Sequence, residues 1–235
     1  MSWNGLSVLG VVPARGGSKS IPRKNLCVVG GRSLLARAAH VAQQLEWLDA
    51  RVLSTDDEEI AAEGRKHGLE VPFMRPDSLS GDTATSVDMW RHAWLQSEQH
   101  YGQRFDASVL LEPTSPLRTK EDVEHTIGTL VEKRCGAVAT VSPTPAHFTP
   151  HKMLTVSSEG SIGFYLEGGA RYALRQGIPA NYHRNGLCYA VTRQHLVEEG
   201  LILERNAAAV IIERPVVNID EPFELELAEW LLSRS

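Results

Sequence analysis

The chain has 235 residues, a formal net charge of −5, and 42% hydrophobic and 23% charged residues. This length predicts one large domain, or one domain with a smaller appendage, and the composition is that of an ordinary globular protein. The acidic charge argues against general nucleic-acid binding, which selects basic surfaces. No stretch has the length of a membrane span, and the apolar segment Leu6–Val12 lacks the basic flank of an export signal. We therefore expect no nucleic-acid partner and no membrane association.

The three cysteines, Cys27, Cys135 and Cys188, are widely spaced and odd in number. The sequence has no CxxC pair and no histidine cluster with zinc-ligand spacing. This usage favours a reducing compartment, so the expected location is the cytoplasm. We interpret all three thiols as buried and inert.

Strand and helix patterns alternate over the first 141 residues. Ser33 is placed to cap a helix, and Thr119 with Asp122 resembles a capping box at the start of another. Trp90 and Trp94 lie at helical spacing and are interpreted as core residues rather than as a base-stacking platform. The predicted strands are Leu6–Val12, Arg51–Ser54, Glu70–Met74, Ala107–Leu111 and Ala137–Val141, and the predicted helices begin near Ser33, Asp56, Thr85 and Thr119.

The alternation stops at Ser142 and resumes after Tyr182. Residues 142–182 contain several prolines and glycines and one predicted hairpin, formed by Met153–Val156 and Ser161–Leu166. An insertion of this size is too small to bury its own core well, so we expect it to pack on a second subunit. The domain prediction is therefore residues 1–141 and 183–235 as the main domain, with 142–182 as an inserted dimerisation element.

The last part of the chain returns to the earlier rhythm. Strands are predicted at Leu187–Thr192 and Ala208–Ile212, and Pro222 opens a final helix that carries Phe223, Leu227, Leu231 and Leu232. The alternation as a whole predicts an α/β protein with an open, mostly parallel sheet and helices on both faces.

Polar motifs follow four of the predicted strands. In open α/β sheets, ligands bind beyond the carboxyl ends of the strands, so these motifs predict one site. They are Arg15–Asn25, Ser54–Asp57, Arg75–Ser86 and Glu112–Arg118.

The first of these motifs has the composition of an anion-binding loop. Gly16 and Gly17 permit a sharp bend and close backbone approach, and Arg15 can donate two hydrogen bonds to phosphate oxygens. Lys19 and Lys24 add point charges. The loop lacks the glycine spacing of a Walker A loop and of a dinucleotide fingerprint. It therefore predicts a phosphate site of another kind, with a flexible surface loop as the alternative.

Asn218 and Asp220 precede the last predicted helix. In an extended segment, residues two apart share a face, so the two side chains would present oxygens suitable for Mg²⁺. The alternative is that Asp220 only caps the helix. The nine histidines are scattered, and none is assigned a role.

Taken together, the motifs resemble the CMP-sialic acid synthetases, also called acylneuraminate cytidylyltransferases. The matching segments are Pro13–Lys19 with Lys24 and Asn25, Ser54–Asp56, Arg75–Pro76 with Asp82–Ala84, Pro113–Arg118, Asn185–Gly186 with Tyr189, and Ile219–Asp220. They cover nearly the whole chain in the order of that family.

The resemblance implies a Rossmann-like three-layer α/β/α fold with a small inserted dimerisation element, and a homodimer. It also implies a nucleotidyltransferase reaction. CTP and a nonulosonic, sialic-type 2-keto-3-deoxy sugar acid would give the CMP-sugar and pyrophosphate, with Mg²⁺ as the cofactor.

The resemblance also implies roles for individual residues. Arg15, Lys24 and Asp220 are the implied catalytic residues, and Asp220 is the implied metal ligand. The implied nucleotide-binding residues are Arg15, Gly17, Ser18, Lys19, Asn25, Arg75, Ala84 and Ser86. The implied sugar-binding residues are Glu112, Ser115, Arg118, Lys152, Arg175 and Tyr189, of which Lys152 and Arg175 would act across the dimer.

Two residues depart from the family pattern. Glu112 stands where sialic acid enzymes commonly have glutamine, and a carboxylate accepts hydrogen bonds only. This puts N-acetylneuraminate in doubt and favours a related nonulosonic acid, either a deaminated one or one of a legionaminic or pseudaminic type. Asn218 stands where the family often has aspartate, which weakens its case as a metal ligand.

Of three alternatives, the first two stay open. The first is the same reaction on Kdo, and the second is a non-catalytic nucleotide-binding homologue. The third, a glycosyltransferase of similar fold, would need an Asp-x-Asp motif after a mid-chain strand, which the sequence lacks.

Overall fold

The computed structural model describes residues 3–172 and 177–234. These residues divide into two compact units. Unit 1 comprises Met1–Thr140, Asn185–Val210 and Arg214–Ser235, and unit 2 comprises Val141–Arg184 and Ile211–Glu213. The predicted insertion 142–182 falls inside unit 2.

A six-stranded sheet forms the centre of the fold, with the strand order β10-β6-β9-β5-β1-β4. Its strands are β1 (Val8–Pro13), β4 (Ala50–Ser54), β5 (Ala107–Leu110), β6 (Ala137–Pro143), β9 (Tyr182–Thr192) and β10 (Ala207–Ile211). Strand β1 is parallel to both β4 and β5, whereas β9 runs antiparallel to β5, with Tyr189 opposite Leu110. The predicted α/β class with a mostly parallel sheet is confirmed, and β9 is an antiparallel member.

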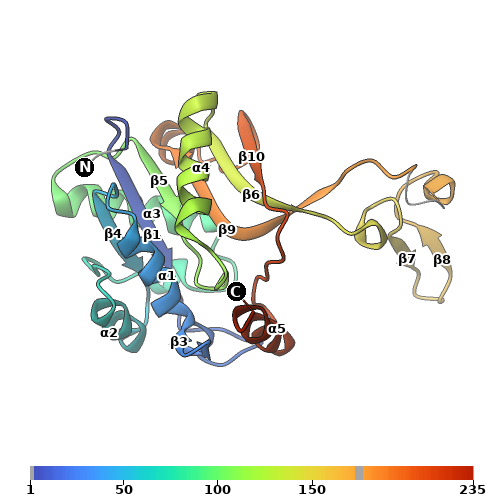
Figure 1. Ribbon diagram of the computed structural model, residues 1–235, viewed down its shortest axis with the longest axis horizontal. Coiled ribbons are helices and arrows are strands. Elements are labelled where there is room, and N and C mark those ends of the chain that lie inside the picture. Colours follow the sequence, from blue (N-terminus) through green and yellow to red (C-terminus); the bar gives the residue numbers. More distant parts are fainter. Residues whose placement is uncertain (1–2, 173–176, 235) are drawn as a thin grey trace. The chain divides into compact units, whose positions relative to one another are not determined.

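Helices cover both faces of this sheet. They are α1 (Leu34–Gln44), α2 (Glu58–Lys66), α3 (Ser86–Tyr101), α4 (Lys120–Lys133) and α5 (Pro222–Leu232). Figure 1 shows α1 and α4 in front of the sheet and α3 behind it, which is the predicted three-layer arrangement. Among the described residues, no helix combines the length and the apolar run that crossing a bilayer requires.

The helix starts follow the capping residues seen in the sequence. The Ser33 hydroxyl accepts a hydrogen bond from the Ala36 N–H at 3.0 Å, and Thr119 forms a complete capping box with Asp122. Helix α2 begins at Glu58 because Asp57, rather than an earlier residue, caps it. Each cap satisfies backbone N–H groups that have no partner within the helix.

The two central tryptophans belong to the core. Trp90 and Trp94 on α3 are fully buried, and the Trp90 indole N–H donates to the Ser108 hydroxyl on β5 at 2.9 Å. This bond satisfies the polar atom of a buried indole and ties α3 to the sheet.

Two sequence predictions about regular structure are corrected. The segment Glu70–Met74 is not a strand, since only Glu70 forms an isolated bridge with Val52. Pro72 has no N–H for a ladder, so the chain leaves the sheet edge there. On α5, Phe223 and Leu227 are exposed, whereas Leu225, Ala228, Leu231 and Leu232 face an apolar cluster with Leu34 and Ile219.

Unit 2 contains the predicted hairpin. Strands β7 (Leu154–Val156) and β8 (Ile162–Phe164) pair antiparallel, with Leu154 opposite Phe164. The unit extends beyond the predicted bounds, because Ile212 donates a backbone hydrogen bond to Val141 at 2.8 Å and Thr144 contacts His183 Nδ1 at 3.1 Å.

The remaining elements are short. They are the β2 (Val28–Val29) and β3 (Arg32–Ser33) hairpin, the 3₁₀ turns Lys24–Leu26, Asp77–Leu79, Ala146–Phe148 and Gly169–Tyr172, and a π-helical turn at Gln194–Glu198.

Candidate functional site

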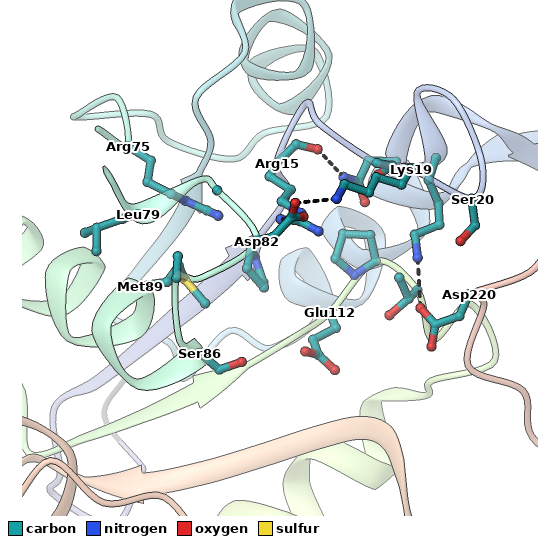
Figure 2. A pocket seen from close by; sticks show the side chains of 18 of the residues that line it. Arg15, Lys19, Ser20, Arg75, Leu79, Asp82, Ser86, Met89, Glu112 and Asp220 are labelled. Carbon is teal, nitrogen blue, oxygen red and sulfur yellow. Dashed lines mark hydrogen bonds and ion pairs between the residues drawn. The ribbon is translucent and has the colours of Figure 1, made fainter. Parts of the chain in front are cut away.

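A pocket of about 400 Å³ lies in unit 1, where β1 and β5 end. Three of the four predicted polar motifs supply its walls, and Figure 2 shows their side chains around one cavity. The lining residues are Pro13, Arg15, Ser18, Lys19, Ser20, Ile21, Lys24, Asn25, Arg75, Leu79, Gly81, Asp82, Ala84, Thr85, Ser86, Met89, Glu112, Pro113, Thr114 and Asp220.

The fourth motif, Ser54–Asp57, supports the first loop from behind. The Gly16 N–H donates to the Asp56 carboxylate at 3.0 Å. A β-carbon on Gly16 would lie 2.8 Å from the Asp57 carboxylate, so a larger residue here would displace the side chain that caps α2. On the other side, the Asn25 amide donates to the Arg15 carbonyl at 3.0 Å. The loop that carries Arg15 and Lys19 is therefore braced at two points before any ligand binds.

Arg15 and Lys19 share an acidic partner across the pocket. Lys19 Nζ lies 2.5 Å from Asp82 Oδ2, and Arg15 Nη1 lies 3.5 Å from Asp82 Oδ1 and 3.3 Å from the Ser80 carbonyl. These two cations hold the pKa of the Asp82 carboxyl below its usual range. Two adjacent cations on one wall can neutralise a polyphosphate.

Lys24 and Asp220 meet at a second point of the pocket. Lys24 Nζ lies 3.0 Å from Asp220 Oδ1 and 2.8 Å from the Ile219 carbonyl. The Lys24 side chain is 15% exposed and that of Asp220 is 69% exposed, so the carboxylate faces the open side. The alternative in which Asp220 caps the last helix is wrong, because Glu221 is the N-cap of α5 and forms a capping box with Glu224.

Asn218 does not accompany Asp220 into the pocket. Its Oδ1 accepts a hydrogen bond from the Ser115 hydroxyl at 3.4 Å, and the segment is not a strand. The period-two argument for a shared face therefore does not apply, and Asn218 lies outside the pocket lining.

Arg75 forms the floor on the side of α3. Its Nε donates to the Ser54 hydroxyl at 3.0 Å and its Nη2 to the Ser54 carbonyl at 2.5 Å. Burial, with a smaller contribution from nearby Arg15, lowers the pKa of Arg75 to about 10, so it stays charged at neutral pH. The small or apolar residues Leu79, Ser86 and Met89 line the same side of the pocket (Figure 2), and Ala84 is also a lining residue. This wall has the size and character of a site for a small planar group.

Glu112 lines the wall across from the Arg15 and Lys19 side chains (Figure 2). Its backbone carbonyl accepts a hydrogen bond from Arg118 Nη2 at 2.6 Å. The Arg118 guanidinium is buried and also donates to the carbonyls of Leu187 and Gly186. Burial lowers the pKa of Arg118 to about 10. Two of its nitrogens, Nε and Nη2, thus donate to backbone carbonyls, and Arg118 lies outside the pocket lining.

The other predicted sugar residues lie outside the pocket lining. Ser115 is buried and donates to the Asn185 carbonyl at 3.4 Å. Tyr189 is partly buried and packs against the core cluster of α3. Lys152 belongs to unit 2, and Arg175 lies outside the described residues. Gly17, which the resemblance implies as a nucleotide-binding residue, precedes the lining residue Ser18 but does not line the pocket itself.

Sequence reasoning assigned no role to several lining residues. The most important of these is Asp82, which lies in a recognised polar motif but was given no role of its own. The sequence could have pointed to it, because it is an acidic residue in a glycine-containing loop at the same sheet edge as the cationic loop. Leu79, Thr85 and Met89 carried no comparable signal.

The donor set fits a bound magnesium ion only when phosphate is present. Within residues 3–172 and 177–234, no group of three or more His, Cys, Asp or Glu side chains could hold a metal on its own. Mg²⁺ in phosphate sites takes one or two carboxylates, phosphate oxygens and waters. The exposed carboxylate of Asp220 at the pocket edge meets that requirement.

Comparisons with known proteins identify the family of the chain. A family model described as "Cytidylyltransferase" matches residues 9–229. The chain is 28% identical over 226 residues to a post-translational flagellin modification protein B of Campylobacter coli, covering 96% of this chain and 94% of the relative. It is 28% identical to a CMP-N,N'-diacetyllegionaminic acid synthase of Legionella pneumophila, covering 97% of each. It is 29% identical to a pseudaminic acid cytidylyltransferase of Campylobacter jejuni, covering 94% of each.

A solved structure of CMP:2-keto-3-deoxy-manno-octonic acid synthetase complexed with CTP has a similar fold. The TM-score is 0.72 at 16% identity, over 97% of this chain and 99% of that one.

Proposed function

The chain belongs to the cytidylyltransferase family, and on that premise we propose that it activates a nonulosonic sugar acid with CTP, releasing pyrophosphate. The observation that carries the proposal is one pocket in which Arg15, Lys19 and Lys24 surround a concave space beside the small wall at Arg75. Relatives of similar length are named as legionaminic and pseudaminic acid enzymes, which supports an acid sugar of this class.

The reaction needs positioning and charge neutralisation. The anomeric hydroxyl oxygen of the sugar bonds to the α-phosphorus of CTP, and the bond from that phosphorus to the bridging β-phosphate oxygen breaks. The proton of the hydroxyl passes to solvent water. Negative charge develops on the departing pyrophosphate, which Arg15 and Lys19 are placed to neutralise. Lys24, held by Asp220 and the Ile219 carbonyl, lines the same pocket and is placed to stabilise the reacting phosphate.

We propose Mg²⁺ as the cofactor, held by the Asp220 carboxylate. When bound, it would supply charge neutralisation at phosphate oxygens. Asp220 can serve this purpose because its carboxylate is exposed on the pocket side, and its present partner Lys24 keeps a second acceptor in the Ile219 carbonyl.

Glu112 bears on which sugar acid is accepted. A carboxylate offers only acceptors, so it selects hydroxyl or amino donors on the ligand. This favours a legionaminic or pseudaminic type over N-acetylneuraminate. Kdo is the competing substrate class.

We further propose that unit 2 mediates a homodimer. It exposes large apolar side chains that a unit of this size cannot bury itself, and such patches mark interaction sites. They are Phe148, Met153, Leu154, Val156, Ile162, Phe164, Tyr165 and Tyr182. In the dimer, Lys152 and Arg175 would contribute cations to the sugar carboxylate of the neighbouring subunit. All three cysteines are free, which supports a cytoplasmic location, although only Cys135 and Cys188 are buried and the expectation of a buried Cys27 is wrong.

The test is pyrophosphate release by the purified chain with Mg²⁺, using CTP and a panel of legionaminic, pseudaminic, sialic and Kdo acids. The proposal predicts release that requires both CTP and a nonulosonic acid, with GTP inactive. Release with Kdo alone would assign the alternative substrate. CTP binding without release on any acid would support a non-catalytic homologue.

A further inference from the structure

Arg15 and Lys19, the cations proposed to bind phosphate, already form ion pairs with Asp82, another residue that lines the pocket. Asp82 bonds Lys19 at 2.5 Å and reaches Arg15 at 3.5 Å, while the Ser80 carbonyl accepts from Arg15 at 3.3 Å. Arg15, Lys19 and Asp82 all line the pocket, and the two cations are the groups proposed to neutralise the nucleotide phosphates. A triphosphate and the Asp82 carboxylate therefore compete for the same donors.

The loop that carries Asp82 is fixed at both ends and open in the middle. At one end, the Arg75 N–H donates to the Thr55 carbonyl at 2.7 Å, and at the other, Thr85 caps α3. Between them, a β-carbon on Gly81 would meet nothing within 4 Å, and Asp82 is exposed. The carboxylate can thus move away while Arg75 and Ser86 keep their places.

From this geometry we propose that Asp82 is a specificity-determining residue which makes nucleotide capture depend on the β- and γ-phosphates. It deepens the proposed function and rests on it for the identity of the nucleotide. A triphosphate carries enough charge to replace Asp82 at both Arg15 and Lys19. A monophosphate that reaches only the Lys24 side leaves the Asp82 pairs intact. When pyrophosphate departs, Asp82 returns to the two cations and opposes its rebinding.

The experiment is calorimetric titration of wild type and Asp82→Asn with three probes: CTP, CMP and inorganic tripolyphosphate, all in EDTA so that no metal contributes. Asparagine keeps the shape of the side chain and removes the competing charge. Asp77→Asn is the matched control, because Asp77 is an exposed acid of the same loop whose carboxylate forms no ion pair in the described part of the chain.

Exposed ion pairs of this kind are weak individually, so the expected gain is moderate. Asp82→Asn should bind CTP and tripolyphosphate about three- to tenfold tighter than wild type, with CMP affinity within about twofold. Asp77→Asn should move all three probes by less than about twofold. In turnover assays, the Asp82→Asn enzyme should be inhibited by pyrophosphate at correspondingly lower concentration.

Equal or weaker tripolyphosphate binding by Asp82→Asn would overturn the inference, and so would an equal gain for CMP. A gain that Asp77→Asn reproduces would reduce it to a general charge effect and overturn it too. If CTP fails to bind while tripolyphosphate shows the predicted gain, the nucleotide assignment is wrong and the competition stands. If neither CTP nor tripolyphosphate binds wild type or Asp82→Asn, in EDTA or in a repeat titration with Mg²⁺, both proposals fall.

Discussion

Replacement of Arg118 by methionine separates a structural role from a ligand-binding one. The buried guanidinium donates to the carbonyls of Leu187, Glu112 and Gly186, which joins the loop after β5 to strand β9. Methionine has similar length and cannot donate, so the three buried acceptors would lose their partner. The sequence resemblance implied a sugar contact for this residue, whereas its donors point to backbone.

The magnitude follows from those bonds. Hydrogen bonds from a charged donor contribute about 1.5–3 kcal/mol each, and two of the three are close. Relief of the buried charge offsets part of this, which leaves a net loss of about 3–5 kcal/mol in the free energy of unfolding. For a chain of this length, the midpoint of thermal unfolding should fall by about 6–20 °C.

The assay is differential scanning calorimetry with kcat and KM measured on the same preparations at 20 °C. Arg32→Met is the control, since Arg32 is exposed on the β2–β3 hairpin, and it should change stability by less than about 0.5 kcal/mol. A midpoint within about 2 °C of wild type, together with a raised KM for the sugar acid, would refute the structural reading of Arg118.

Four further predictions concern other residues. Arg15→Ala should lower kcat/KM about 10²-fold through loss of charge neutralisation on the leaving group, and an effect below twofold would remove Arg15 from the site. Asp220→Ala should lose most activity and its response to Mg²⁺, and a fully active, Mg²⁺-responsive variant would contradict the metal role. Burial raises the pKa of the Cys188 thiol to about 12, so the folded state holds this proton more tightly than the unfolded state. The contribution of this group to the free energy of unfolding is therefore complete below pH 9 and declines between about pH 9 and 12. Rapid alkylation of Cys188 in the native protein at pH 8 would argue against this burial. Ile162→Asp, at a site 71% exposed in unit 2, should shift the protein from dimer to monomer in light scattering, whereas Val28→Asp, at a site 67% exposed in unit 1, should not, and equal behaviour of the two variants would exclude unit 2 as the interface.

Much of the fold could be predicted because local signals and burial agree. Ser33, Thr85 and Thr119 start helices by satisfying backbone donors, and β1, β4 and β5 are apolar enough to occupy a covered sheet. The strand predicted at Glu70–Met74 was wrong because the prediction followed the apolar residues of this segment and gave too little weight to Pro72, which cannot donate a ladder hydrogen bond. The buried face of α5 was predicted wrongly because apolar residues lie on every side of this helix, so their spacing does not show which side is buried.

The site was predictable in part for a similar reason. Parallel strands end at one edge, so the motifs that follow β1 and β5 had to meet, and Arg15, Lys24 and Glu112 do line one pocket. Which donors a ligand can use depends on contacts that spacing does not reveal. Arg118 donates to backbone carbonyls, and Asn218 accepts a hydrogen bond from Ser115. Asp82 forms ion pairs with Arg15 and Lys19 of the first loop.

The central claim is that this pocket holds CTP with its phosphates on the first loop. A crystal structure of the protein with CTP tests it most directly. The account predicts the triphosphate at Arg15 and Lys19 and the cytosine beside Arg75, Ala84 and Ser86. Density for the nucleotide elsewhere, with the first loop empty, would contradict it.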